Sequence, residues 1–151
     1  MDEVQVEQSN YQMPPQEGFT VCHYLTVDDI ERSAEFYAKV FGGTIVSRAD
    51  GKGAPAYVKI ANTWLLLNIG GGPTPDKPTV TLQPPPDPNA ISSFMNIRVA
   101  DIKACYDLWR SRGATFLTEP IPKYGETRCY IRDPDGYIIE VGQANPGVKY
   151  G

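Results

Sequence analysis

The sequence predicts an α+β fold of two tandem βαβββ modules, related by a pseudo-twofold axis and forming a cupped sheet around a cavity. The first observation is a repeat, because Ser93–Ile102 (SFMNIRVADI) matches Val21–Ile30 (VCHYLTVDDI) position by position. The second observation is that three short strand candidates follow the helix that begins in each copy. Tandem copies of one supersecondary unit are typical of an internally symmetric fold.

The first module covers about residues 19–70 and begins with a β-branched and aromatic strand at Thr20–Val27. Asp28 or Asp29 then caps a helix, which Gly42 and Gly43 end. Three strand candidates complete the module: Thr44–Arg48, Ala56–Ile60 and Trp64–Ile69.

Glycine and proline dominate the connector, about residues 71–90, so we expect a linker with at most a short edge strand at Thr79–Leu82. The second module covers about residues 91–143. Its first strand ends at Val99, and its helix begins near Ile102 and stops at Gly113. Three strand candidates follow: Thr115–Thr118, Thr127–Ile131 and Tyr137–Val141. Residues 1–18 are polar and are expected to form a flexible arm, which leaves residues 19–146 as a single domain.

Composition excludes several classes of function. A chain of 151 residues with a net charge of −4 is large enough for one packed domain and is poorly suited to nucleic acid. The three cysteines form no CxxC pair, so the sequence implies neither a disulfide framework nor a cysteine zinc site. The apolar runs are too short to span a membrane, and no basic segment precedes an apolar one at the start. We therefore expect a cytoplasmic protein.

The last strand contains the most informative single residue. Asp133-Pro134-Asp135-Gly136 has the composition of a tight turn, and the apolar run after it is interrupted by Glu140. A glutamate in such a run costs free energy unless it has a partner or faces a wet cavity. This strand therefore predicts a sheet with one polar concave face, and Glu140 is the candidate catalytic residue.

Two segments carry a resemblance to a known family. Leu25–Tyr37 (LTVDDIERSAEFY) and Asp133–Val141 (DPDGYIIEV), set in paired βαβββ modules, resemble the vicinal oxygen chelate (VOC) superfamily over about residues 21–143. That superfamily includes glyoxalase I, fosfomycin- and bleomycin-resistance proteins and extradiol dioxygenases. Its members share a fold but not a reaction, so the resemblance implies the architecture and leaves the chemistry open.

The resemblance also implies where a metal would bind. Family ligands occur in the first and last strands of each module, and Glu140 falls on the final position. The other positions hold Cys22, Phe94 and a residue of the segment Leu66–Asn68, which contains no carboxylate. His23 lies one residue from a ligand position. Either a register shift brings it to a metal shared with Glu140, or strand alternation turns it beneath a helix.

The opposite face of the two first strands predicts the ligand-binding residues. Tyr24, Phe94, Asn96 and Arg98 should line a mixed aromatic and polar cavity together with Glu140. Arg98 could hold a ligand carboxylate, or it could form a structural ion pair with Glu140 that involves no ligand. The sequence leaves both alternatives open.

Two functions follow from these residues. The favoured one is a small-molecule-binding protein of the glyoxalase/bleomycin-resistance type, with a metal-free pocket and no cofactor. The alternative is a metal-dependent lyase or isomerase similar to glyoxalase I, with a divalent ion held by His23 and Glu140. The partner in either case is a small organic ligand rather than nucleic acid or a membrane. The resemblance and the open sheet edges also imply a homodimer. Whether the protein is an enzyme is left open.

Overall fold

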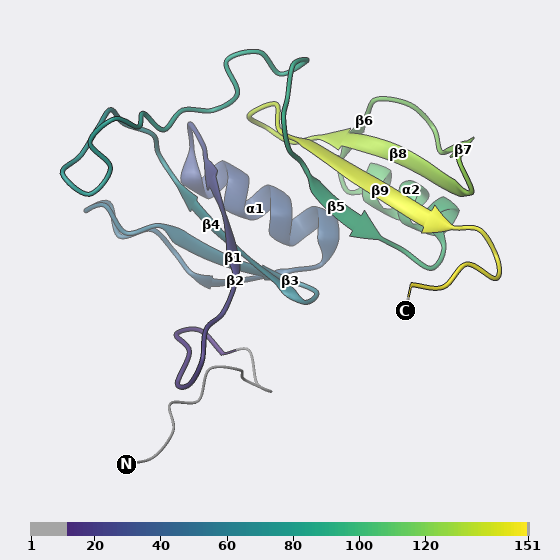
Figure 1. The fold of residues 1–151 in the computed structure, drawn as a ribbon, viewed down its shortest axis with the longest axis horizontal. Helices are drawn as coiled ribbons and strands as arrows, with labels where there is room; N and C mark the ends of the chain where they lie inside the picture. Colours follow the sequence, from purple (N-terminus) through teal and green to yellow (C-terminus); the bar gives the residue numbers. More distant parts are fainter. Residues whose placement is uncertain (1–11, 151) are drawn as a thin grey trace.

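The computed structural model describes residues 12–150, and these form two modules that lie side by side (Figure 1). The elements of module 1 are β1 (Cys22–Thr26), α1 (Ile30–Phe41), β2 (Thr44–Ser47), β3 (Ala56–Ile60) and β4 (Thr63–Asn68). Those of module 2 are β5 (Met95–Arg98), α2 (Ile102–Ser111), β6 (Thr115–Phe116), β7 (Ile121–Lys123), β8 (Glu126–Arg132) and β9 (Ile138–Ala144). The α+β class and the two repeated modules are confirmed.

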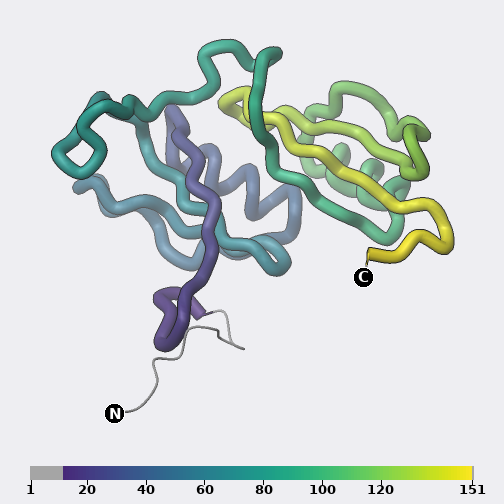
Figure 2. The backbone as a smooth tube through the Cα atoms, in the orientation of Figure 1, coloured from purple at the N-terminus to yellow at the C-terminus, as the bar shows by residue number. Residues whose placement is uncertain are grey.

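Each module forms its own sheet with the same strand order. The first sheet runs β1-β4-β3-β2, and the second runs β5-β9-β8-β6 with β7 added beside β8. The first strand of each module pairs in parallel with the last strand of that module. β1 and β5 are consequently edge strands. The long connector between the sheets passes along one side of the molecule, as the tube in Figure 2 shows.

Strand alternation separates a core face from an open face in each sheet. On β1, Leu25 is 5% exposed and packs toward α1, whereas Tyr24, on the other face, is 40% exposed. On β5, Ile97 packs against the core, and its neighbour Asn96 is exposed. Each helix therefore covers one face of its sheet and leaves the opposite face available.

Local sequence explains both helices. Asp29 caps α1 and Asp101 caps α2, and each carboxylate accepts a hydrogen bond from a backbone N–H three residues later. Gly42 ends α1 with a φ of 71°, which glycine adopts without strain. Between the two alternatives at the start of α1, the structure selects Asp29.

Module 2 holds the N-terminal end of α1 through the turn before β9. The Asp135 carboxylate accepts hydrogen bonds from the Asp28 backbone N–H (2.8 Å), the Ser33 hydroxyl (3.0 Å) and the Arg32 guanidinium (3.0 Å). Its side chain is fully buried. A negative charge at a helix N-terminus is favourable because the backbone N–H groups there are partly positive. The turn chemistry seen in the sequence thus joins the two modules.

The same helix is held by module 2 at two further points. Tyr37 of α1 donates a hydrogen bond of 2.6 Å to the buried Asp133 carboxylate. At the C-terminal end, the Arg112 guanidinium donates to the Val40 carbonyl at 3.1 Å, where a positive charge is favourable. These contacts fix the second sheet relative to the first and so determine where their open faces lie.

Among the described residues Leu82 makes only an isolated bridge with Gly71, so Thr79–Leu82 forms no strand, in agreement with the expectation of at most a short one. One element does differ from the sequence expectations. Strand β7 was not expected, since Pro122 lies in its centre. It is accommodated because β7 is an edge strand, where a missing N–H costs little. Most of the expected arm, residues 1–11, lies outside the described residues.

Within residues 12–150 there is no helix with the length and apolar character needed to cross a membrane.

Candidate functional site

Glu140 lies in the centre of the open face of the second sheet. Its β-sheet neighbours are Asn96 on β5 and Tyr130 on β8, so the three side chains form one row across the sheet. Glu140 is only 5% exposed, and the two sequence-predicted residues Asn96 and Glu140 are brought together. A carboxylate so deeply placed on an otherwise accessible face requires polar partners.

Tyr130 is one of those partners. Burial raises the pKa of Tyr130, and the negative charge of Glu140 and a hydrogen bond between the two groups raise it further. The ring of Phe94 meets the Tyr130 ring edge to face, with centroids 5.9 Å apart. The row therefore combines one carboxylate, one amide and two aromatic rings.

The next row of the sheet contains Arg98, Gly142 and Arg128. A Cβ at position 142 would lie 2.0 Å from Nη1 of Arg98 and 2.7 Å from its Cζ. Only glycine leaves this space, so the guanidinium rests directly on the backbone of β9. From there, Nη2 of Arg98 donates to the Glu126 carboxylate at 2.6 Å, and Nη1 lies 3.7 Å from Oε1 of Glu140.

Glu126, rather than Glu140, is the main partner of Arg98. Its shorter contact raises the pKa of Arg98 and lowers the pKa of Glu126. Arg128 adds a second contact to Glu126 at 3.4 Å. The site thus holds two cations and two anions and is close to neutral, which limits how strongly it attracts a single anionic group.

Sequence reasoning missed Glu126 and Arg128. Both precede Tyr130 at spacings of two in the run ETRCYIR, so all three side chains fall on one face of a strand. That spacing was the available signal. The expected strand began at Thr127 and so left out Glu126, whereas Arg128 lay within it, two residues before Tyr130.

The first sheet presents a different open face. Leu66 pairs with Tyr24 as Glu140 pairs with Asn96, so Leu66 is the module 1 counterpart of Glu140. Beside it, the indole Nε1 of Trp64 is buried and has no hydrogen-bond partner among residues 12–150. The Lys59 ammonium lies 5.3 Å from the centre of the same ring. The open face of the first sheet is therefore mainly aromatic and apolar, whereas the open face of the second sheet carries charged side chains.

Tyr24 and Phe94 both line a small cavity between β1 and β5, with a volume of about 170 Å³. His23 also lines this cavity, on the core side of β1 beside Leu65. Strand alternation therefore places His23 on the face that it shares with Leu25. This is the face given by the second sequence interpretation, in which His23 is not turned toward Glu140. The side chain is nevertheless exposed, because it lies at the open end of that face.

The donor set does not fit a metal ion held at the family's ligand positions. Those positions carry Cys22, Leu66, Phe94 and Glu140, which supply one thiol and one carboxylate. Burial raises the pKa of Cys22, which disfavours the thiolate that binds metals. Across residues 12–150, no three His, Cys, Asp or Glu side chains are grouped closely enough to hold an ion.

The paired sheets, each with a helix on one face and an open face on the other, define a VOC-type protein. Residues 19–141 match the family model of the Glyoxalase/Bleomycin resistance protein/Dioxygenase superfamily. The chain therefore belongs to this superfamily, as the sequence resemblance predicted.

Individual relatives are distant. A probable lactoylglutathione lyase from Vibrio cholerae is 25% identical over 144 residues, covering 83% of this chain and 92% of that protein. A glyoxalase/bleomycin resistance protein/dioxygenase from Nocardioides has a similar structure, with a TM-score of 0.66, 23% identity and 92% coverage of both chains. An antibiotic-binding protein from a Streptomyces species has a TM-score of 0.58 and 21% identity, over 82% of this chain and 93% of that one. The structural similarities show the fold alone.

Proposed function

We propose that this protein binds a small organic molecule on the open face of the second sheet, in a pocket that uses no metal. The observation that carries the proposal is Glu140, a buried carboxylate on a face that no helix covers. Tyr130 forms a hydrogen bond with it, Arg98 at 3.7 Å partly balances its charge, and Phe94 adds an apolar surface for a ligand. Few polar groups set among aromatic rings are typical of small-molecule sites.

A homodimer in the cytoplasm is part of the same proposal. The open faces of both sheets are wide, and Tyr24 and Phe94 are 40% and 44% exposed. A second copy could enclose these faces and bury the aromatic rings, as association through a twofold axis allows. Sedimentation at micromolar concentration tests this, and a monomer there would contradict the dimer.

The metal-dependent lyase is the second candidate, because the Vibrio cholerae relative is a probable lactoylglutathione lyase. Glu140 would then act on the substrate. His23 is an unsuitable second ligand, since it lies on the core side of β1 and Glu140 lies on the open side of β9. Formation of lactoylglutathione from glutathione and methylglyoxal that needs added zinc or nickel and disappears in Glu140→Gln would favour this candidate over the first.

Binding is tested by calorimetric titration with two probes, bleomycin and lactoylglutathione. Arg98→Ala should weaken the binding of whichever probe is recognised by about 10-fold or more, because a hydrogen bond to a charged group is lost. Arg48→Ala is the matched control, since Arg48 pairs with Glu31 on the surface of module 1. Equal affinity in both variants would refute the role of Arg98, and loss of folding in Arg98→Ala would identify it as a structural residue.

A further inference from the structure

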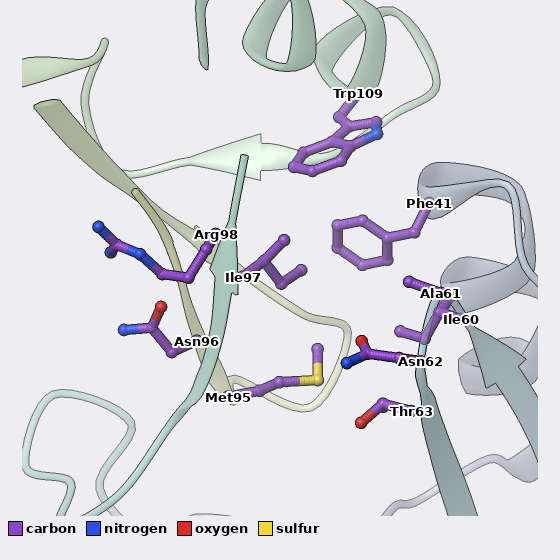
Figure 3. Close-up of a pocket in the computed structure, with 10 residues that line it drawn as sticks. All are labelled: Phe41, Ile60, Ala61, Asn62, Thr63, Met95, Asn96, Ile97, Arg98 and Trp109. Carbon is purple, nitrogen blue, oxygen red and sulfur yellow. The ribbon is translucent and has the colours of Figure 1, made fainter. Parts of the chain in front are cut away.

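A second cavity lies behind β5, between the two modules. It measures about 370 Å³ and is bordered by the C-terminal end of α1, the β3–β4 turn, β5 and α2. In Figure 3, Met95 and Ile97 point toward Phe41 and Asn62 across this space, whereas Asn96 and Arg98 point to the opposite side of β5. The cavity is therefore separate from the open face proposed above as the ligand site.

The walls of this cavity are aromatic and aliphatic. Phe41 and Trp109 meet edge to face with centroids 4.9 Å apart, one from each module. Ile60 and Ile97 add branched side chains, and Met95 adds a thioether that adapts readily to the shape of a ligand. The volume is at the lower end of the range of about 300–1,000 Å³ typical of ligand pockets, which suits one or two rings.

Polar groups occur along two borders. The Asn62 amide projects from the β3–β4 turn. On β5, the Val99 N–H donates to the Gly142 carbonyl of β9 at 2.9 Å, so backbone groups of alternate residues turn toward β9. The N–H and C=O groups of Asn96 and Arg98 consequently face the other edge, where β5 pairs with no strand of the described chain. Such an edge offers a donor and an acceptor in a fixed arrangement.

Among the described residues, no ionic group points into this cavity to balance a charged ligand. Arg98, the single charged residue along its border in the described chain, turns away and pairs with Glu126 at 2.6 Å. Burying an uncompensated charge among these walls would be costly. The chemistry therefore favours a ligand that is planar, uncharged and able both to donate and to accept hydrogen bonds.

We propose that this cavity binds a small neutral heteroaromatic molecule that carries an amide or an equivalent donor–acceptor edge. Its ring contacts Phe41, Trp109 and Met95. Its polar edge pairs with the free backbone groups of β5 and with the Asn62 amide. Because the walls come from both modules, the bound molecule also stabilises the contact between them.

The test uses three probes of one shape: neutral nicotinamide, anionic nicotinate and cationic 3-(aminomethyl)pyridine. Each is titrated to 10 mM into the full-length ¹⁵N-labelled protein. We expect nicotinamide to shift the indole N–H resonance of Trp109 and the backbone amide of Arg98, and the charged probes to bind much more weakly. Trp64→Phe assigns the two indole signals. The proposal would be overturned if the Trp64 and Tyr130 resonances shifted while the Trp109 resonance did not, or if all three probes shifted the Trp109 resonance equally.

Two variants at one exposed position complete the test. Asn62→Ala should raise the dissociation constant for nicotinamide by about 3- to 10-fold, the effect of one hydrogen bond. Asn62→Trp should block the cavity and abolish the Trp109 shift. Asn145→Ala is the matched control, because it removes an exposed amide that does not line the cavity. Unchanged affinity in both Asn62 variants would overturn the proposal. So would a change of oligomeric state in Asn62→Trp, since a second copy would then occupy this surface.

Discussion

Asp135 should contribute more to stability than any surface carboxylate, because it holds the N-terminal end of α1 from the other module. In Asp135→Ala the Asp28 N–H and the Ser33 hydroxyl lose their acceptor, at 2.8 and 3.0 Å. The Asp135 side chain is fully buried and Ser33 is 0% exposed, so water replaces the carboxylate poorly. The Arg32 side chain is 46% exposed and becomes solvated instead.

These contacts give the expected loss in the free energy of unfolding. The buried Ser33 hydroxyl without its acceptor costs about 1–3 kcal/mol, and the Asp28 N–H, which lies at an exposed position, costs about 0.5–1.5 kcal/mol. The exposed Arg32 contact adds only about 0–1 kcal/mol. We therefore expect Asp135→Ala to lower the free energy of unfolding by about 2–5 kcal/mol, a large part of the 5–15 kcal/mol typical of such domains.

Urea unfolding at pH 7, followed by tryptophan fluorescence and circular dichroism, measures this loss. Asp28→Ala is the matched control, since Asp28 takes part through its backbone N–H and its side chain is exposed. That control should change stability by less than about 0.5 kcal/mol. A loss below 1 kcal/mol in Asp135→Ala, or equal losses in the two variants, would refute the reasoning that the turn joins the modules.

Three further predictions concern the open face of the second sheet. Gly142→Ala should displace the Arg98 guanidinium from the backbone of β9, because a Cβ at position 142 would lie 2.0 Å from Nη1. Calorimetry should then show that probe binding is weakened as much as in Arg98→Ala, and wild-type affinity would contradict this. The stability difference between wild type and Glu126→Gln should be present at pH 7 and shrink as pH falls below 4.5. This direction follows because the Arg98 hydrogen bond lowers the pKa of Glu126 from that ordinary value, so its contribution disappears on protonation; urea titrations at several pH values measure the difference, and a difference independent of pH would count against the pair. Purified protein should contain well under one equivalent of zinc, nickel, iron or manganese, and a chelator should leave its melting temperature unchanged; stoichiometric metal that is lost in Glu140→Gln would reverse this expectation.

The sequence alone determined the two-module architecture and the residues near which both helices begin. The repeat of VCHYLTVDDI in SFMNIRVADI predicted the two modules, because local hydrophobic alternation and Asp caps depend on neighbours in the chain. The same alternation predicted that Asn96 and Glu140 share a face and that Leu25 packs beneath a helix. The family followed from these segments and from the turn before β9.

Only the tertiary structure decided which charges meet. The sequence offered Arg98 either a ligand carboxylate or Glu140 as its partner, but antiparallel pairing of β8 with β9 brings Glu126 closer. Register between distant strands is not a local property. The role of Asp135 was also hidden, since its donors lie more than 100 residues away in the chain. Likewise, the cavity behind β5 exists because the C-terminal end of α1 meets α2, where Phe41 contacts Trp109. Contacts of this kind depend on how the modules pack, and no spacing within either module encodes them.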